Sequence, residues 1–88
     1  MSRANEKHRT RRAFEREAAR YILGEAKKID LKGTDRQVSV VTAALKSSKQ
    51  LYRTLSSSAT LQECRAALEE KRRTAREFRD VFGYVWPF

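Results

Sequence analysis

Residues 34–55 read TDRQVSVVTAALKSSKQLYRTL, and this stretch decides the fold. A set of mostly apolar residues recurs in it at alternating steps of three and four. The members of this stripe are Val38, Val41, Leu45, Ser48, Tyr52 and Leu55. Because a helix makes one turn in about 3.6 residues, the spacing places them on a single face. Such a face must be buried by other parts of the chain, so the stretch predicts a packed helical domain.

Local chemistry marks both ends of this helix. Thr34 and Gln37 stand at the spacing of a capping box, in which the two side chains bond backbone N–H groups of the first turn. Gly33 precedes the segment and a run of serines at 56–58 follows it. The sequence therefore predicts a helix over residues 35–55.

A helical pattern also covers residues 11–32. Its apolar residues fall in one sector and include Phe14, Ala18, Ile22 and Ile29. We expect Gly33 to close this helix in the left-handed conformation that glycine tolerates. Residues 1–10 are basic and offer little to a core, so they are interpreted as a basic arm, either loose or a frayed first turn.

The last helix is predicted over residues 60–82. Thr60 and Glu63 repeat the capping-box spacing. The expected core stripe is Leu61, Cys64, Leu68, Ala75, Phe78 and Phe82, with Lys71 as a polar member at its edge. Gly83 ends the helix, and residues 83–88 form an apolar tail rich in aromatic side chains.

These elements predict one all-α domain. Short connections between consecutive amphipathic helices favour antiparallel neighbours. The expected fold is a small antiparallel three-helix bundle with a basic N-terminal arm and an aromatic C-terminal tail. Its 88 residues are few for a self-sufficient core, so a partner that shares apolar surface would add stability.

The excess of basic residues indicates which classes of partner the protein could bind. Twenty Lys and Arg against eleven Asp and Glu give a net charge of +9, which suits nucleic acid, an anionic membrane or an acidic protein surface. No apolar run approaches the about 20 residues that span a bilayer. Cys64 is the only cysteine, so no intrachain disulfide forms and a reducing intracellular compartment is expected: the cytoplasm or, alternatively, the mitochondrial matrix.

The inventory of reactive groups is thin. His8 is the only histidine and lies far along the chain from Cys64. The sequence has no Gly-rich phosphate loop and no grouping with metal-ligand spacing. We therefore expect a non-catalytic protein that uses no metal and no cofactor.

Basic residues at helical spacing are the main functional signal. The predicted nucleic-acid-binding residues are Arg9, Arg11, Arg12, Arg16, Arg20, Lys27, Arg72, Arg73 and Arg76. Arginine makes paired hydrogen bonds to phosphate oxygens, so these faces could follow a phosphate backbone. The expected function is contact with structured RNA or a ribonucleoprotein. An ordinary solvated surface is the competing interpretation.

A second hypothesis is a small accessory or regulatory subunit that docks on a larger protein assembly. The residues predicted to bind such a partner are Leu51, Tyr52, Arg53, Phe82, Tyr84, Trp86 and Phe88. For the tail, two interpretations remain open at this point. Its aromatic side chains either fold back over their own bundle or form an exposed patch that docks on the partner.

Leu51-Tyr52-Arg53, followed later by Phe78-Arg79, resembles the motif of the mitochondrial LYR-motif accessory proteins. That resemblance implies a small, helical, non-enzymatic adaptor that binds acyl carrier protein or iron–sulfur assembly components. In the family the tripeptide opens the first helix, whereas here it closes the second predicted helix.

Asp30 and Gly33, followed by Gln37-Val38 with Val41-Thr42, resemble the entry into the second helix of the small ribosomal-subunit protein fifteen family, whose members are helical binders of ribosomal RNA. Arg72-Arg73 and Phe78 follow at a comparable distance. The His-Lys-Lys-Asp and Ser-Arg-Arg segment that contacts RNA in that family is absent, and residues 55–58 stand in its place.

Overall fold

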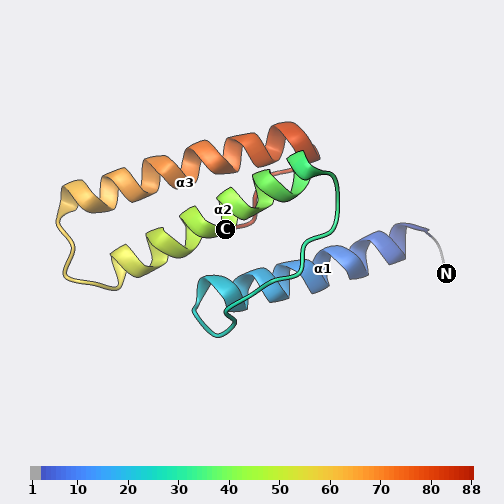
Figure 1. Cartoon of the computed structure of the whole chain (residues 1–88), viewed down its shortest axis with the longest axis horizontal. Helices are drawn as coiled ribbons and strands as arrows, with labels where there is room; N and C mark the ends of the chain where they lie inside the picture. Colours follow the sequence, from blue (N-terminus) through green and yellow to red (C-terminus); the bar gives the residue numbers. More distant parts are fainter. Residues whose placement is uncertain (1–2) are drawn as a thin grey trace.

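The computed structural model describes the backbone of residues 3–88 and the side chains of residues 11–88. It contains three helices, α1 (Arg3–Ile22), α2 (Asp35–Leu55) and α3 (Leu61–Phe82), shown in Figure 1. The predicted all-α class and small helical bundle are confirmed. Within the described part of the chain, no helix has both the length and the apolar character needed to cross a membrane.

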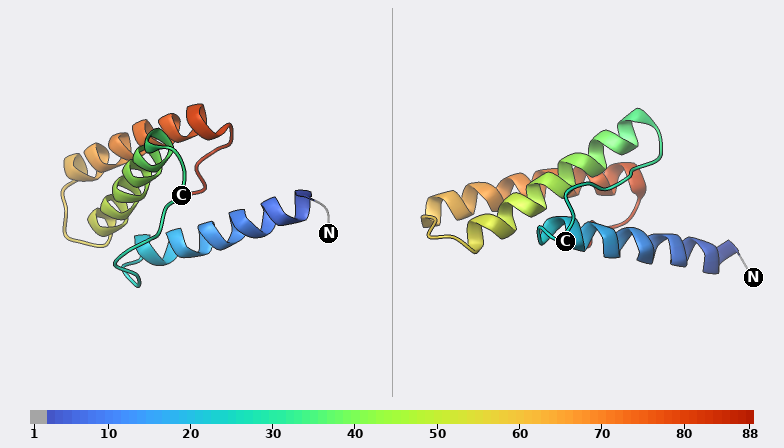
Figure 2. Two further views of the ribbon diagram at one scale, coloured as in Figure 1. Left: turned by 45° about the vertical axis from the view of Figure 1, so that its right-hand side comes forward. Right: turned by 60° about the horizontal axis from the view of Figure 1, so that its bottom comes forward.

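The helices α2 and α3 form the framework of the fold. They run in opposite directions and pack along their lengths, joined by the short connection 56–60 (Figures 1 and 2). The N-cap of α3 is Thr60, whose hydroxyl accepts from the Glu63 backbone N–H at 3.1 Å. At the other end, Gly83 takes the left-handed conformation and donates its N–H to the Arg79 carbonyl at 2.8 Å.

The predicted capping box at the start of α2 is also present. The Thr34 hydroxyl accepts from the Gln37 N–H at 3.1 Å, and the Thr34 N–H donates to Gln37 Oε1 at 2.9 Å. Gly33, at a φ of 150°, makes room for this arrangement. A Cβ on Gly33 would lie 2.6 Å from Gln37 Oε1.

The first helix differs from its prediction at both ends. It begins at Arg3, so most of the expected basic arm belongs to α1, while residues 1–2 lie outside the described part. It ends at Ile22, ten residues before the predicted boundary at 32, and Gly24 (φ 84°) is the left-handed residue, not Gly33. The Gly24 N–H donates to the Tyr21 carbonyl at 3.1 Å and the Glu25 N–H to the Arg20 carbonyl at 2.8 Å. This pair of bonds is a Schellman motif, which satisfies the last carbonyls and stops the helix.

In a simple three-helix bundle α1 would pack against α3, but here the C-terminal tail lies between them. Over residues 3–88, the backbone of α1 approaches that of α2 but not that of α3. The tail turns back after α3 and passes between α1 and the α2–α3 pair (Figure 2). Its Trp86 ring meets Phe14 of α1 edge-on, with centroids 6.2 Å apart.

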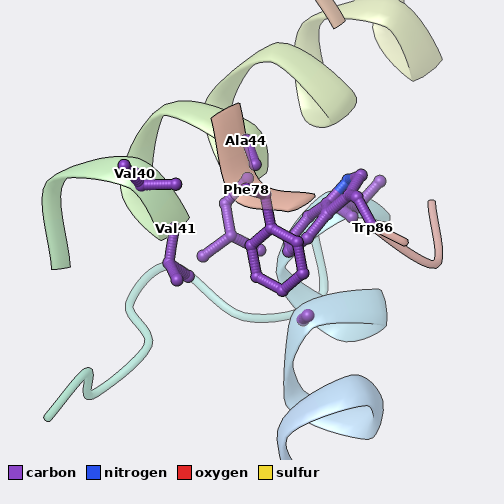
Figure 3. Close-up of a cluster of buried hydrophobic side chains, with 8 residues drawn as sticks. Val40, Val41, Ala44, Phe78 and Trp86 are labelled. Atoms are coloured by element: carbon purple, nitrogen blue, oxygen red, sulfur yellow. The ribbon is translucent and has the colours of Figure 1, made fainter. Parts of the chain in front are cut away.

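The hydrophobic core lies where α1, α2, α3 and the C-terminal tail meet. Its buried apolar residues are Ala18, Ile22, Val40, Val41, Ala44, Leu45, Phe78 and Trp86. Phe78 lies between α2 and the indole of Trp86, at a centroid distance of 4.8 Å from the latter (Figure 3). Ile29 and Leu31, which were predicted to be helical, pack against this core from the connection between α1 and α2.

The predicted core stripes are wrong at the far end of the α2–α3 pair. Tyr52, Leu55 and Leu61 are 44%, 64% and 68% exposed. The reason is architectural, because the turn end of the pair projects beyond the end of α1 in every view, and the tail stops short of it (Figures 1 and 2). These side chains therefore remain exposed among the described residues 11–88.

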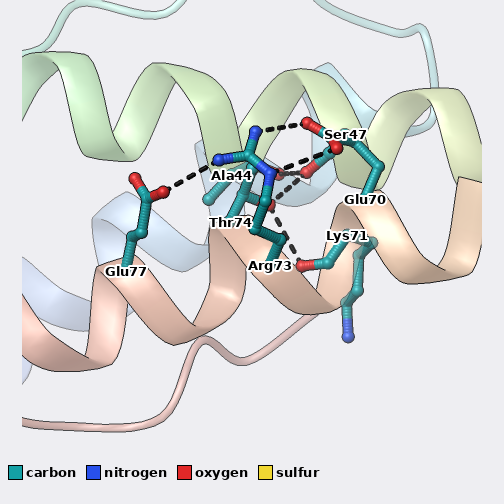
Figure 4. A network of polar contacts seen from close by, with 7 residues as sticks. All are labelled: Ala44, Ser47, Glu70, Lys71, Arg73, Thr74 and Glu77. Atoms are coloured by element: carbon teal, nitrogen blue, oxygen red, sulfur yellow. Dashed lines mark hydrogen bonds and ion pairs between the residues drawn. The ribbon is translucent and has the colours of Figure 1, made fainter.

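A buried hydroxyl pair joins α2 to α3. Ser47 Oγ is hydrogen-bonded to Thr74 Oγ1 across the two helices, as Figure 4 shows. Each hydroxyl also lies within bonding distance of a carbonyl of its own helix, that of Ala44 at 3.1 Å and that of Lys71 at 3.0 Å. Two hydroxyl protons cannot serve three bonds at once, so one hydroxyl donates across the interface while the other donates to its own helix.

Candidate nucleic-acid interface

Three arginines form a row on the outer side of α1. Arg12, Arg16 and Arg20 are all exposed and follow each other at four-residue steps, about 6 Å per step along the axis. Ala18 and Ile22, on the opposite side of the helix, enter the core. We call Arg12, Arg16 and Arg20 the α1 row.

The members of the α1 row form no ion pair with the described side chains. Ion pairs between described side chains join Arg11 to Glu15, and Arg73 to Glu70 and Glu77. No member of the α1 row takes part in them. Its guanidinium groups therefore keep their hydrogen-bond donors for water or for a ligand.

Arg11 has a different environment from the α1 row. Its guanidinium carbon lies 3.7 Å from the centroid of the Tyr84 ring, and its Nε lies 3.6 Å from a Glu15 oxygen. Arg11 thus ties α1 to the tail by a cation–π contact. Burial raises the pKa of the Tyr84 phenol, an effect that the positive charge of Arg11 partly opposes.

Two further predicted residues do not extend the α1 row. Lys27 is exposed but lies in the connection after α1, because the helix ends at Ile22. The Arg9 backbone belongs to α1, and its side chain is outside the described part of the structure.

On α3 the three predicted arginines divide into two kinds. Arg73 bridges two acids of its own helix, with its Nε 3.2 Å from Glu70 Oε2 and its NH1 2.8 Å from Glu77 Oε1 (Figure 4). The hydrogen bond from Arg73 lowers the pKa of the Glu70 carboxyl. Arg72 and Arg76 are exposed and form none of the ion pairs found among residues 11–88.

Arg72 and Arg76 share their side of α3 with two arginines absent from the predicted set. We call these four residues the α3 row: Arg65, Arg72, Arg76 and Arg79. All four are exposed, and their steps of seven, four and three keep them on one face. The spacing was readable in the sequence; the ion pairs that set Arg73 apart from its neighbours were not, because they depend on side-chain conformations.

The tail residues predicted to bind a partner are used inside the domain. Trp86 is buried, and its indole N–H donates to Ser48 Oγ at 2.8 Å. Phe82, Tyr84 and Phe88 pack against the same core. The tail therefore folds back over its own bundle, the first of the two interpretations. Of the other predicted partner residues, Leu51 is half-buried, whereas Tyr52 and Arg53 are exposed.

The exposed groups of both rows are guanidinium groups, which donate hydrogen bonds to anionic oxygens. Across residues 11–88, no three His, Cys, Asp or Glu side chains gather where they could hold a metal ion. Cys64 is a half-buried free thiol. In comparisons with known proteins, no family model, curated protein or solved structure matches this chain.

Proposed function

We propose that this protein is a non-catalytic, basic helical nucleic-acid-binding protein that contacts structured RNA through arginine rows on its helices. The observation that carries the proposal is the α1 row. Three exposed arginines at regular spacing, with no acid of the described chain paired to them, are more than solubility requires. The net charge of +9 points to the same class of partner.

The binding mechanism would be electrostatic. Each guanidinium offers a fork of N–H donors that matches two phosphate oxygens. Binding releases the cations condensed on the phosphates, so the affinity falls as the salt concentration rises. Such contacts position the protein on a nucleic acid but do not read bases. We therefore expect recognition of backbone shape, with little preference for sequence.

The test is a salt series of the affinity for a hairpin RNA, compared with a duplex DNA. The variant Arg12→Gln, Arg16→Gln, Arg20→Gln removes the α1 row. Each lost phosphate contact should reduce the slope of log affinity against log salt by about 0.7 to 0.9, hence by roughly 2 to 3 for the triple variant. Weaker binding to the DNA would support the preference for RNA.

A control of equal charge separates location from net charge. It replaces three exposed cations outside both rows: Lys32→Gln, Arg36→Gln and Lys46→Gln. We expect this variant to keep most of the wild-type slope. An equal loss in both variants, or wild-type binding that is flat across the salt series, would contradict the proposal.

A further inference from the structure

An uncovered apolar surface lies at the turn end of the α2–α3 pair. Three large side chains are exposed there, Tyr52 at 44%, Leu55 at 64% and Leu61 at 68%. Three more apolar side chains beside them are half-buried. We call this set the hairpin-tip face: Leu51, Tyr52, Leu55, Leu61, Cys64 and Leu68.

The hairpin-tip face continues the side of the pair that α1 and the tail cover. On α2, Tyr52 follows Ser48, the acceptor of the Trp86 bond, by one turn. On α3, Leu68 and Cys64 extend the line of Ala75 and Phe82, which pack on the core. The helix α1 therefore lies beside one end of this side of the α2–α3 pair and does not reach the turn end (Figure 1), where Tyr52, Leu55 and Leu61 are exposed.

Cations outnumber acids next to this face, where Glu69 of α3 is an exposed acid. Arg53 on α2 and Arg65 and Arg72 on α3 are exposed beside it. Residues 36–62 contain no Asp or Glu. The first acid that follows, Glu63, belongs to the α3 cap, where its carboxylate accepts from the Thr60 hydroxyl at 3.3 Å.

We propose that the hairpin-tip face binds an amphipathic helix of a partner protein, whose apolar stripe is flanked by Asp and Glu. The apolar residues lie on two antiparallel helices and extend over about one turn of α2 and two turns of α3, so a third helix can pack against both. The cationic rim selects acidic flanks. A second copy of this chain would oppose cations to cations. A phosphate backbone would leave Leu55 and Leu61 in water.

This inference uses none of the α1 row, which carries the nucleic-acid proposal, although Arg65 and Arg72 of its rim also belong to the α3 row. The probe is a designed helical peptide with leucines on one face and glutamates on both flanks. The comparison peptide carries lysines in place of the glutamates. We expect the acidic peptide to bind about tenfold or more tightly than the basic one, because like charges oppose each other across the face. In an NMR titration with the acidic peptide, the chemical-shift changes of the protein's backbone amides should centre on residues 51–55 and 61–68.

Two variants test the surface itself. Leu55→Ser with Leu61→Ser removes exposed side chains, so the fold stays intact, and we expect the peptide affinity to fall about tenfold or more. Arg53→Glu with Arg65→Glu should reverse the preference toward the basic peptide. The proposal is overturned if the acidic peptide does not bind, or if its shift changes lie on the α1 row. It is also overturned if the leucine variant instead loses affinity for anionic vesicles or hairpin RNA while it keeps the peptide.

Discussion

Ser48 connects parts of the chain that are far apart in sequence. It lies on the apolar stripe of α2, and its hydroxyl accepts the indole N–H of Trp86 in the core. A tail that docks through a buried N–H needs an acceptor of this kind, because a buried donor left without a partner is costly. The polar member of the stripe is therefore a part of the docking site for the tail.

The variant Ser48→Ala should lower the free energy of unfolding by about 1 to 3 kcal/mol, since the Trp86 N–H stays buried without an acceptor. Urea unfolding followed by tryptophan fluorescence measures the change. The matched control is Ser39→Ala, which makes the same substitution at an exposed position of α2. A loss no larger than that of the control would show that the bond contributes nothing to stability.

Gly33→Ala should destabilise the start of α2 by about 1 kcal/mol, the usual contribution of a helix cap. The added methyl would meet Gln37 Oε1 at 2.6 Å and displace the capping side chain. Thermal unfolding of Gly33→Ala, Gln37→Ala and the double variant forms a cycle. We expect the double variant to lose less than the sum of the single losses, because the clash with Gln37 Oε1 is gone and only the strain of an alanine at a φ of 150° remains. Strictly additive losses would contradict this explanation.

Tyr84 should make the fold sensitive to alkaline pH. Burial raises the pKa of its phenol above the ordinary value of 10.0, so the folded state holds this proton more tightly than the unfolded state does. The resulting stability is fully present below pH 10.0 and is lost as the pH rises through the folded pKa. Tyr84→Phe keeps the ring over Arg11 and should reduce this alkaline loss in urea-unfolding midpoints. The control Tyr52→Phe removes an exposed phenol and should follow the wild type.

At the scale of the helices, the boundaries that depend on short-range chemistry were predictable. Thr34 with Gln37, Thr60 with Glu63, and Gly83 all act within one turn, and the structure places them as caps. The end of α1 was mispredicted because apolar spacing continues past Gly24 to Ile29. Ile29 does pack on the core, but from an irregular connection, so periodicity alone could not tell the two cases apart.

The location of the tail could not be predicted from the sequence. Its aromatic composition allowed two outcomes, and the choice depends on contacts that join distant residues. Ser48 supplies the acceptor for Trp86, Phe14 supplies a ring edge, and Arg11 covers Tyr84. For the same reason, the exposure of Leu55 and Leu61 followed only from where α1 and the tail end. The spacing of apolar residues identified the stripe, but it could not show how much of the stripe α1 and the tail cover.

Removal of residues 84–88 should loosen α1 more than α2 and α3. The tail supplies the Trp86 and Tyr84 contacts to Phe14 and Arg11 of α1, whereas α2 and α3 pack directly against each other. Amide hydrogen exchange of the truncated chain should therefore be faster in α1, with protection in the middle of α2 largely kept. The control is the single substitution Val85→Ala, at a tail position that is 69% exposed. Uniformly faster exchange in all three helices would contradict this role of the tail.

On the scale of the whole molecule, the α1 row and the hairpin-tip face differ in composition, while Arg65 and Arg72 of the α3 row border the latter. The α1 row is charged, and no large apolar side chain is exposed within residues 12–20. The hairpin-tip face combines apolar side chains with a cationic rim. A phosphate backbone is complementary to the α1 row, and an amphipathic acidic helix is complementary to the hairpin-tip face. Taken together, the two proposals describe a protein that would join a nucleic acid to a protein partner.

The two proposals together predict that the two surfaces act separately. Arg12→Gln, Arg16→Gln, Arg20→Gln should weaken the hairpin RNA and leave the acidic peptide nearly unchanged, whereas Leu55→Ser with Leu61→Ser should do the reverse. At about 0.15 M salt, charges are screened beyond about 8 Å, so direct contacts decide the outcome more than net charge does. Fluorescence anisotropy with each labelled probe, in the presence and absence of the other, measures both affinities. If each variant weakened both probes, or if saturating peptide displaced the RNA, the two surfaces would be one site, and the division of roles would be wrong.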